Sequence, residues 1–372
     1  MNQNKKTADP SACVHCHLCQ KNCVFLDRYG IDIGDTEKLQ KLAMHCFLCG
    51  KCSRVCPKGI DGRGVILEMR RQAAARNGGK PSEKGYGMLL WEKKDYRFRN
   101  YRNGTGRSVL FTGCNFPSFY PETTRYLAKL LWEKAGMGTV FDCCGKPVAE
   151  LGMKDAEEKI LSDMNRRLEE MGPEELVMLC PNCYHFLKGR LGVRVTDIYT
   201  KLEELGLGQK VPGRLQVFPP CPDRKDRELL GKIRPFLEQE PCLEENVQCC
   251  GLGGCGSVKE PDLAASMTEP MDKGQIFCTY CASCSGAFTR KGYKAQHLLV
   301  SILGREETPD VKRSLSQQSK SQHTGGRKED ETEKLGKKSD HSCDCPRLCG
   351  SLFPCTACEK QHEPGVRHVC QR

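Results

Sequence analysis

The sequence predicts a small cysteine-rich N-terminal region of α+β structure, an α/β body built from two repeated units, and a disordered C-terminal tail with a small Cys/His-rich end. Three observations support this. Cysteine supplies 27 of the 372 residues, mostly at two-residue spacings. Short apolar runs alternate with amphipathic stretches over residues 108–304, as in βαβ units. Beyond them Glu, Lys, Ser and Gln dominate, which indicates disorder.

Composition places the boundaries of the predicted parts and excludes several classes of protein. The parts are 1–61, 62–107, 108–212, 213–304, 305–340 and 341–372. The opening MNQNKKTADP lacks the apolar core of a signal peptide, which favours a reducing cytoplasm over a secreted disulfide framework. No apolar stretch approaches the about 20 residues that a membrane-spanning helix needs.

The first region carries two copies of the spacing C-x2-C-x2-C-x3-C. Its cysteines are Cys13, Cys16, Cys19 and Cys23, followed by Cys46, Cys49, Cys52 and Cys56. A four-iron, four-sulfur cube needs one thiolate per iron, and x2 loops let three thiolates converge while the fourth arrives from elsewhere. Structural zinc is the alternative, because C-x2-C pairs also suit tetrahedral zinc. We expect His15, His17 and His45 to be loop residues and not ligands.

This region resembles a bacterial-type two-cluster ferredoxin, in which the fourth cysteine of each run serves the other cluster. The resemblance implies two cubane [4Fe-4S] clusters. One would be held by Cys13, Cys16, Cys19 and Cys56, and the other by Cys46, Cys49, Cys52 and Cys23. Pro57 follows the second run as in the family, whereas Val24 follows the first, and we expect that departure to change the local turn but not the ligands.

The segment 62–107 is a basic connector, with 12 basic against 4 acidic residues in a chain of formal net charge +11. Residues 62–76 predict a helix, and the remainder predicts irregular structure. A solvated linker is the simplest reading. An anionic partner or phospholipid headgroups are the alternatives, and the latter would place the protein peripherally at the inner face of a membrane. No recognition pattern for nucleic acid is present, so we expect no such partner.

The body repeats one order of motifs twice. Each half has a β-prone run ending in cysteine, a helix-like segment, a run ending in Cys-Cys-Gly, a second helix-like segment and a run ending in C-x2-C. Repeat one supplies Cys114, Cys143, Cys144, Cys180 and Cys183, and repeat two supplies Cys221, Cys249, Cys250, Cys278 and Cys281. Ligands of parallel sheets collect at the carboxyl ends of strands, where these cysteines should lie. Cys242, Cys255 and Cys284 stay unassigned.

These residues resemble the CCG, or cysteine-rich, domain of heterodisulfide reductase catalytic subunits. The resemblance covers residues 108–304 and extends to iron–sulfur subunits of glycolate oxidase, of L-lactate utilisation and of anaerobic glycerol-3-phosphate dehydrogenase. It implies that five cysteines of one motif hold a noncubane four-iron, four-sulfur cluster. Because both sets are complete, one or two such clusters are expected.

The glycines after the second Cys-Cys-Gly, at 251, 253, 254 and 256, spell G-x-G-x-x-G. We do not read them as a dinucleotide site, because the next helix-like stretch begins only near Asp262, behind Pro261. Close packing against a cluster explains them better.

The tail contains six cysteines and three histidines within 30 residues: Cys343, Cys345, Cys349, Cys355, Cys358 and Cys370, with His341, His362 and His368. So few apolar residues could not form a core alone, which suggests a small zinc-folded module. A metal-scavenging tail and an unfolded appendage are the alternatives.

The motifs together predict an iron–sulfur oxidoreductase subunit that acts within a complex. Electrons would pass from the ferredoxin-type clusters to the CCG clusters, which would reduce a disulfide-type substrate. The alternative is an electron-transfer subunit of a flavin-dependent hydroxyacid or glycerol-3-phosphate dehydrogenase. A structural zinc-binding interaction protein is the alternative from another class. Since the chain shows no organic cofactor site, the expected partner is a flavoprotein dehydrogenase or another electron-donating or accepting subunit.

Overall fold

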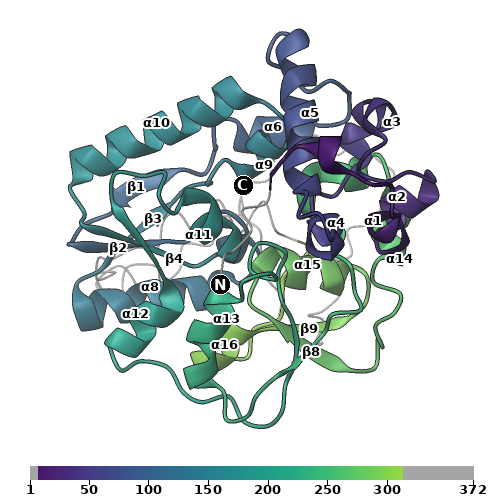
Figure 1. Cartoon of the computed structure of the whole chain (residues 1–372). Coiled ribbons are helices and arrows are strands. Elements are labelled where there is room, and N and C mark those ends of the chain that lie inside the picture. The colour runs from purple at the N-terminus through teal and green to yellow at the C-terminus, as the bar shows by residue number, and fades with distance from the viewer. Residues whose placement is uncertain (1–6, 313–372) are drawn as a thin grey trace, which may run out of the picture. The chain divides into compact units, whose positions relative to one another are not determined.

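The computed structural model describes residues 7–312, which combine α-helices with two mainly parallel β-sheets (Figure 1). The predicted α/β body is therefore confirmed. The predictions for the tail lie outside the described residues from residue 313 onward. No helix in the described part of the chain has both the length and the hydropathy needed to cross a bilayer.

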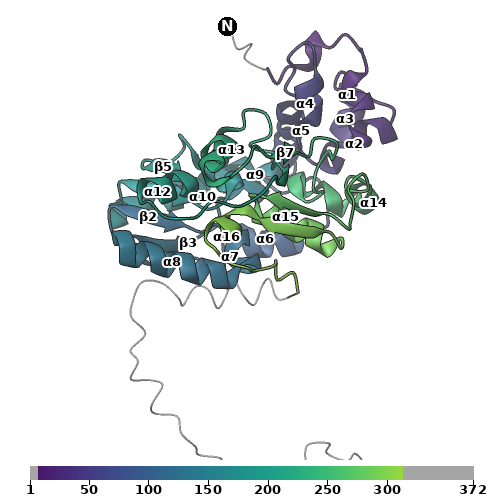
Figure 2. The same ribbon diagram turned by 90° about the horizontal axis from the view of Figure 1, so that it is seen from below.

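The first sheet has five strands in the order β1-β3-β2-β4-β5, parallel except for the edge strand β1. The strands are β1 (Asn100–Asn103), β2 (Ser108–Phe111), β3 (Gly138–Phe141), β4 (Glu175–Met178) and β5 (Arg194–Asp197). The helices are α7 (Asn115–Phe119), α8 (Pro121–Ala135), α9 (Lys146–Glu150), α10 (Lys154–Met171), α11 (Pro181–Leu187) and α12 (Ile198–Glu204). Figure 2 shows α8 on one side of β2 and β3 and α10 on the other, as right-handed crossovers require.

The second sheet has the order β7-β6-β8-β9, and all its strands are parallel. This order matches β3-β2-β4-β5 of the first sheet, so the two halves share one topology. The strands are β6 (Gln216–Phe218), β7 (Cys242–Leu243), β8 (Ile276–Thr279) and β9 (Lys294–His297). The helices are α13 (Glu228–Ile233), α14 (Pro261–Ser266), α15 (Ala282–Arg290) and α16 (Leu298–Ile302), with 3-10 turns η3 (Arg234–Phe236) and η4 (Gly253–Val258).

The sequence predicted a strand that runs directly into the second Cys-Cys-Gly, and this prediction is wrong. Strand β7 ends at Leu243, five residues before Gln248, where the predicted strand would end. The backbone amides of Cys242 and Glu244 donate to Leu215 and Val217, and this pairing holds only the start of the segment. Val247 is fully buried. The segment after β7 therefore packs against the N-terminal region and does not continue the sheet.

The N-terminal region consists of short helices and 3-10 turns joined by loops. Its elements are η1 (Pro10–Ala12), α1 (Leu18–Lys21), α2 (Val24–Arg28), α3 (Thr36–Lys41), η2 (Ala43–His45) and α4 (Lys51–Val55). We expected α+β structure in this region, but the β-structure found between residues 7 and 61 is one isolated parallel bridge between Thr7 and Ile60. Buried thiols take the place of a sheet in its interior, since Cys19, Cys23 and Cys49 belong to the buried cluster.

The basic connector is not a solvated linker. The predicted helix is confirmed as α5 (Gly62–Arg76), but α6 (Gly87–Lys93) and β1 replace the expected irregular structure. Arg70 is 1% exposed, and its guanidinium donates to the carbonyl oxygens of Ala43, Cys46, Glu150 and Gly254 at 2.6–2.8 Å. One cation thus joins the N-terminal region to both halves of the body.

Candidate metal centres

The body cysteines follow the carboxyl ends of the strands. Cys114 follows β2, Cys143 and Cys144 follow β3, and Cys180 and Cys183 follow β4. Repeat two repeats the pattern, with Cys221 after β6, Cys249 and Cys250 after β7, and Cys281 and Cys284 after β8. Because parallel strands end at one edge of a sheet, each set of thiols converges there.

In repeat one the five predicted cysteines form a continuous row of thiols. Cys114 is a hydrogen-bonding neighbour of Cys143, which in turn neighbours Cys144. Cys144 neighbours Cys183, and Cys183 neighbours Cys180. The structure therefore brings all five predicted residues of this repeat together.

In repeat two the structure brings together four of the predicted cysteines and replaces the fifth. Cys221 and Cys249 lie with their Sγ atoms 3.9 Å apart, and Cys249 neighbours Cys250. Cys250 then contacts Cys284, and Cys284 contacts Cys281.

Cys278 does not join this row. It lies inside β8, where its thiol contacts the side-chain oxygen of Gln296 at 4.0 Å. Sequence reasoning missed Cys284 because C-T-Y-C-A-S-C offers two C-x2-C frames. The end of β8 separates them, since Cys281 and Cys284 stand two and five residues past it, as Cys180 and Cys183 stand past β4.

The two rows meet across the repeats. Cys180 of repeat one and Cys281 of repeat two are hydrogen-bonding neighbours. The side-chain amide of Asn182 also donates to Cys281 Sγ at 3.5 Å. Ten thiols therefore form one line that runs from Cys114 to Cys221 through the centre of the body.

Burial and crowding raise the pKa of most of these thiols and lower that of three. Hydrogen bonds from Cys143 and Cys183 lower the pKa of Cys144 to about 5. Equivalent bonds from thiol neighbours hold the pKa of Cys180 and of Cys250 well below the usual range. Thiolates are the form of cysteine that binds metal, and these three thiols are the ones whose environment favours that form.

Buried and half-buried cations flank both rows. Lys93 is 8% exposed and lies near the thiols of Cys114 and Cys143. Lys291 donates to the carbonyl oxygen of Cys250 at 3.1 Å. Arg224 lies beside Cys221 and is 6% exposed. These charges would offset the negative charge of a thiolate-bound cluster.

The N-terminal cysteines form two further groups. Cys23 lies near Cys46 and Cys49, and Cys52 lies near all three. Burial, followed by the neighbouring thiols of Cys49 and Cys46, raises the pKa of Cys23 to about 12. This grouping matches the crossed ligand set expected for the second cubane cluster.

The other group contains the remaining four N-terminal cysteines. Cys13, Cys16, Cys19 and Cys56 line one small cavity of about 10 Å³. Cys16 is exposed, whereas Cys19 is buried. The exposed His15 and His17 place their Nδ1 atoms 3.0 and 3.3 Å from the buried carboxylate of Asp32. Ligand atoms of Cys13, His15 and Asp32 lie within 4.8 Å of one another. These three residues could hold a single cation in place of a cluster.

Gln248 joins the second N-terminal group to repeat two. Its Nε2 donates to Cys23 Sγ at 3.4 Å and to Cys49 Sγ at 3.5 Å, and its Oε1 accepts from the backbone amide of Val24 at 2.9 Å. The next residue is Cys249, and Cys221 is an electrostatic neighbour of Cys49. The two groups of thiols are therefore adjacent.

The glycine run packs against this same region. Gly254 has φ +65°, and a Cβ there would lie 2.5 Å from the carbonyl carbon of Phe47. A Cβ at Gly256 would lie 2.9 Å from the carbonyl oxygen of Cys46. The run therefore lets repeat two approach the loop that carries Cys46, as packing against a cluster requires.

The residues present fit iron–sulfur clusters. The structure supplies two groups of four thiols and two rows of five, and its described cysteines are all free thiols. Four thiolates satisfy a cubane cluster.

Comparison with known proteins finds a known domain in repeat one and several distant relatives of the chain. Residues 108–188 match the family model "Cysteine-rich domain", named CCG. The chain is 25% identical over 302 residues to one of the subunits of fumarate reductase (CoM/CoB) from Methanothermobacter marburgensis, covering 68% of this chain and 61% of that one. It is 26% identical over 279 residues to an uncharacterised iron–sulfur protein of Methanococcus maripaludis, covering 65% and 56%.

A third relative is one of the subunits of dihydromethanophenazine:CoB--CoM heterodisulfide reductase from Methanosarcina acetivorans, 22% identical over 281 residues, covering 62% of this chain and 67% of that one. The chain spans about three fifths of the length of the first two relatives. The match to the family model lies within repeat one, whose Cys-Cys-Gly motif follows the parallel strand β3.

Proposed function

We propose that the chain is an iron–sulfur electron-transfer subunit of a reductase, in which two N-terminal cubane clusters supply electrons to noncubane clusters on the two rows of the body. The observation that carries this proposal is the order of the thiol groups. Cys16 is exposed, the group of Cys23 adjoins repeat two through Gln248, and repeat two adjoins repeat one through Cys281 and Cys180. Iron–sulfur clusters supply one-electron steps when bound there.

The proposed reaction is reduction of a disulfide-type substrate at the body rows. A disulfide takes up two electrons and two protons, its sulfur–sulfur bond breaks, and two thiols form. The electrons come from a partner subunit, a flavoprotein or another electron donor. Reductase subunits among the relatives support this class of reaction.

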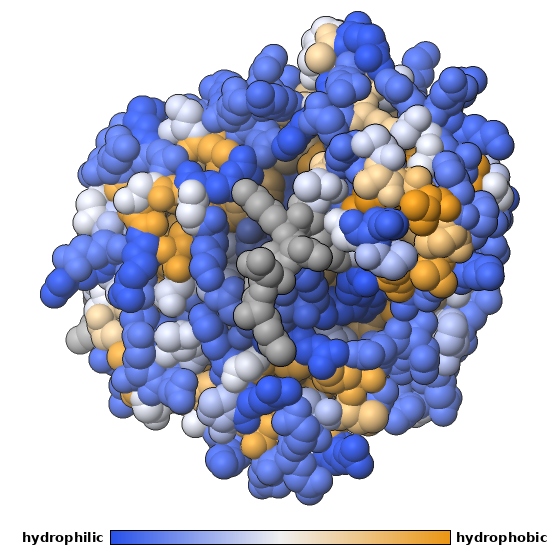
Figure 3. Space-filling model, in the orientation of Figure 1, coloured by the Kyte–Doolittle hydropathy of each residue, from blue (hydrophilic) through white to orange (hydrophobic). Residues whose placement is uncertain are grey.

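The partner would dock where the first thiol group reaches the surface. Val14 and Leu18 flank Cys16 and are 57% and 42% exposed. Figure 3 shows hydrophobic surface over α1 and α2 on a face that is otherwise mostly hydrophilic. An apolar surface beside the outermost thiols suits a transient protein contact.

Anaerobic purification followed by iron and sulfide analysis and electron paramagnetic resonance tests the proposal. We expect about four irons for each occupied group and turnover of hydroxyethyl disulfide with reduced methyl viologen. Cys249→Ala should abolish turnover, while dithionite should still reduce the N-terminal clusters. Cys242→Ala is the matched control. Protein with zinc and without sulfide would refute the cluster proposal, and full turnover by Cys249→Ala would leave only a relay function.

A further inference from the structure

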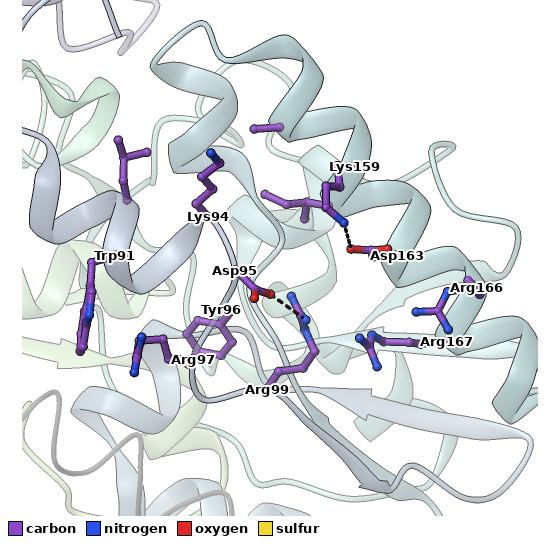
Figure 4. A pocket seen from close by; sticks show the side chains of 13 residues that line it. Trp91, Lys94, Asp95, Tyr96, Arg97, Arg99, Lys159, Asp163, Arg166 and Arg167 are labelled. Carbon is purple, nitrogen blue, oxygen red and sulfur yellow. Dashed lines mark hydrogen bonds and ion pairs between the residues drawn. The ribbon is translucent and has the colours of Figure 1, made fainter. Parts of the chain in front are cut away.

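A hollow of about 840 Å³ lies between α10 and the segment that contains α6 and the loop after it (Figure 4). Helix α10 contributes Ala156, Lys159, Ile160, Asp163, Arg166 and Arg167. Their spacing places them on one face of the helix. Residues 90–99 supply the opposite wall. The hollow is therefore built by the connector and repeat one together.

The lining is strongly basic. Six cations, Lys94, Arg97, Arg99, Lys159, Arg166 and Arg167, face two carboxylates, Asp95 and Asp163. Three cations are ion-paired: Arg99 with Asp95 and Asp142 at 3.1 Å, Lys159 with Asp163 at 2.9 Å, and Arg166 with Glu170 at 2.7 Å. A concave wall with an excess of positive charge focuses its field on the space inside, unlike a flat solvated surface.

The other three cations, Lys94, Arg97 and Arg167, have no ion pair within residues 7–312. The Arg97 guanidinium lies over the ring of Trp91, 4.4 Å from its centroid, and that of Arg167 lies 5.7 Å from the centroid of Tyr101. Arg167 Nε is buried without a hydrogen-bond partner. A guanidinium stacked on a ring still presents its N–H edge, which matches phosphate and carboxylate oxygens.

The floor of the hollow adjoins the thiol row. Tyr96 lines the hollow, is 4% exposed, and packs against Cys114 and Cys143. These thiols form the end of the row that lies farthest from repeat two. A ligand in the hollow would therefore lie behind the last thiols of repeat one, separated from them by Tyr96.

We propose that this hollow binds a small polyanion with three or four negative charges on phosphate or carboxylate groups, and that Arg97 and Arg167 are its main ligands. The unpaired cations, the excess of four positive charges and the concave shape carry the proposal. It goes beyond the proposed electron-transfer function and does not depend on which clusters the thiols hold.

Isothermal titration calorimetry of the full chain with inorganic pyrophosphate and with citrate tests this site. We expect one molecule of at least one probe to bind, more weakly as salt is raised. Preference for pyrophosphate would assign a phosphorylated ligand, and preference for citrate a polycarboxylate. Arg97→Ala/Arg167→Ala should weaken binding by more than about tenfold.

Lys210→Ala/Arg214→Ala is the matched control, because it removes two cations that do not line the hollow, and it should change affinity by less than about twofold. The exposed Arg97→Ala alone serves if the double variant does not fold, and an unchanged circular dichroism spectrum confirms folding. Absence of binding by both probes, or equal affinity in the lining and control variants, would overturn the proposal. Such a result is independent of whether the disulfide is reduced.

Discussion

The side-chain amide of Gln248 donates a hydrogen bond to the Cys49 thiol over 3.5 Å, from one region of the chain to another. The same nitrogen reaches Cys23, and the amide oxygen accepts from Val24. Because Cys249 follows directly in the chain, Gln248 connects the second N-terminal group to repeat two through one residue. Hydrogen bonds to ligating sulfur are one of the determinants of cluster potential.

Gln248→Leu should lower the reduction potential of the cluster held by Cys23, Cys46, Cys49 and Cys52, because donated hydrogen bonds stabilise the more negative, reduced state. A differential of about 1 kcal/mol corresponds to roughly 40 mV for a one-electron couple. Redox titration followed by electron paramagnetic resonance measures it. Gln72→Leu, an exposed position on α5, should leave the potential unchanged. Equal potentials in both variants would argue against this role.

Cys284→Ser should remove the cluster of repeat two, and Cys278→Ser should not. The first substitution removes a thiol that contacts Cys250 and Cys281, whereas the second removes one that lies within β8. Iron analysis should show a loss of about four irons only in Cys284→Ser. Loss of iron in Cys278→Ser but not in Cys284→Ser would show that Cys278 is the ligand.

Arg70→Met should destabilise the chain by about 3 kcal/mol or more, because four buried carbonyl groups would lose their donor. We expect the midpoint of thermal unfolding to fall by roughly 5–10 °C. Arg76→Met, at the exposed end of the same helix, tests whether any loss of arginine from α5 has this effect. Similar midpoints for both variants would contradict the prediction.

Glu175 should make stability depend on pH in the acid range. It is 1% exposed, and burial raises its pKa, but Lys201, Ser108 and Arg194 together lower the pKa below the ordinary value of 4.5. The stabilisation is therefore complete above pH 4.5 and is lost as pH falls through the folded-state pKa.

Circular dichroism at pH 7 and pH 4 measures this dependence. Glu175→Gln should be less stable than the natural chain at pH 7 and should lose less on acidification. Glu203→Gln, at an exposed position on α12, is the control and should follow the natural chain. A parallel fall in all three proteins would exclude Glu175 as the origin.

Local patterns predicted much of the fold. The helix over residues 62–76 and most of the parallel strands of the body follow from the apolar spacing in the sequence. The family resemblance is likewise confirmed by the match over residues 108–188. The predicted domain boundaries and cluster ligands stay predictions.

Long-range packing could not be predicted in the same way. Arg70 and Lys93 looked like solvated charges, and only tertiary structure shows which carbonyls and thiols surround them. The choice between Cys278 and Cys284 depends on where β8 ends, a boundary that a repeated C-x2-C spacing does not fix. Gln248 lies beside a Cys-Cys-Gly motif, but its contact with Cys23 spans 225 positions of the chain.

The uneven exposure of the thiols bears on how the protein meets oxygen. Among the cysteines of the four groups within residues 7–312, Cys16 alone is exposed, while those of the body are buried or half-buried. Damage by air should therefore begin at the outermost group and advance inward. An aged preparation would first lose its capacity to accept electrons from outside, while its innermost sulfur sites would still be intact.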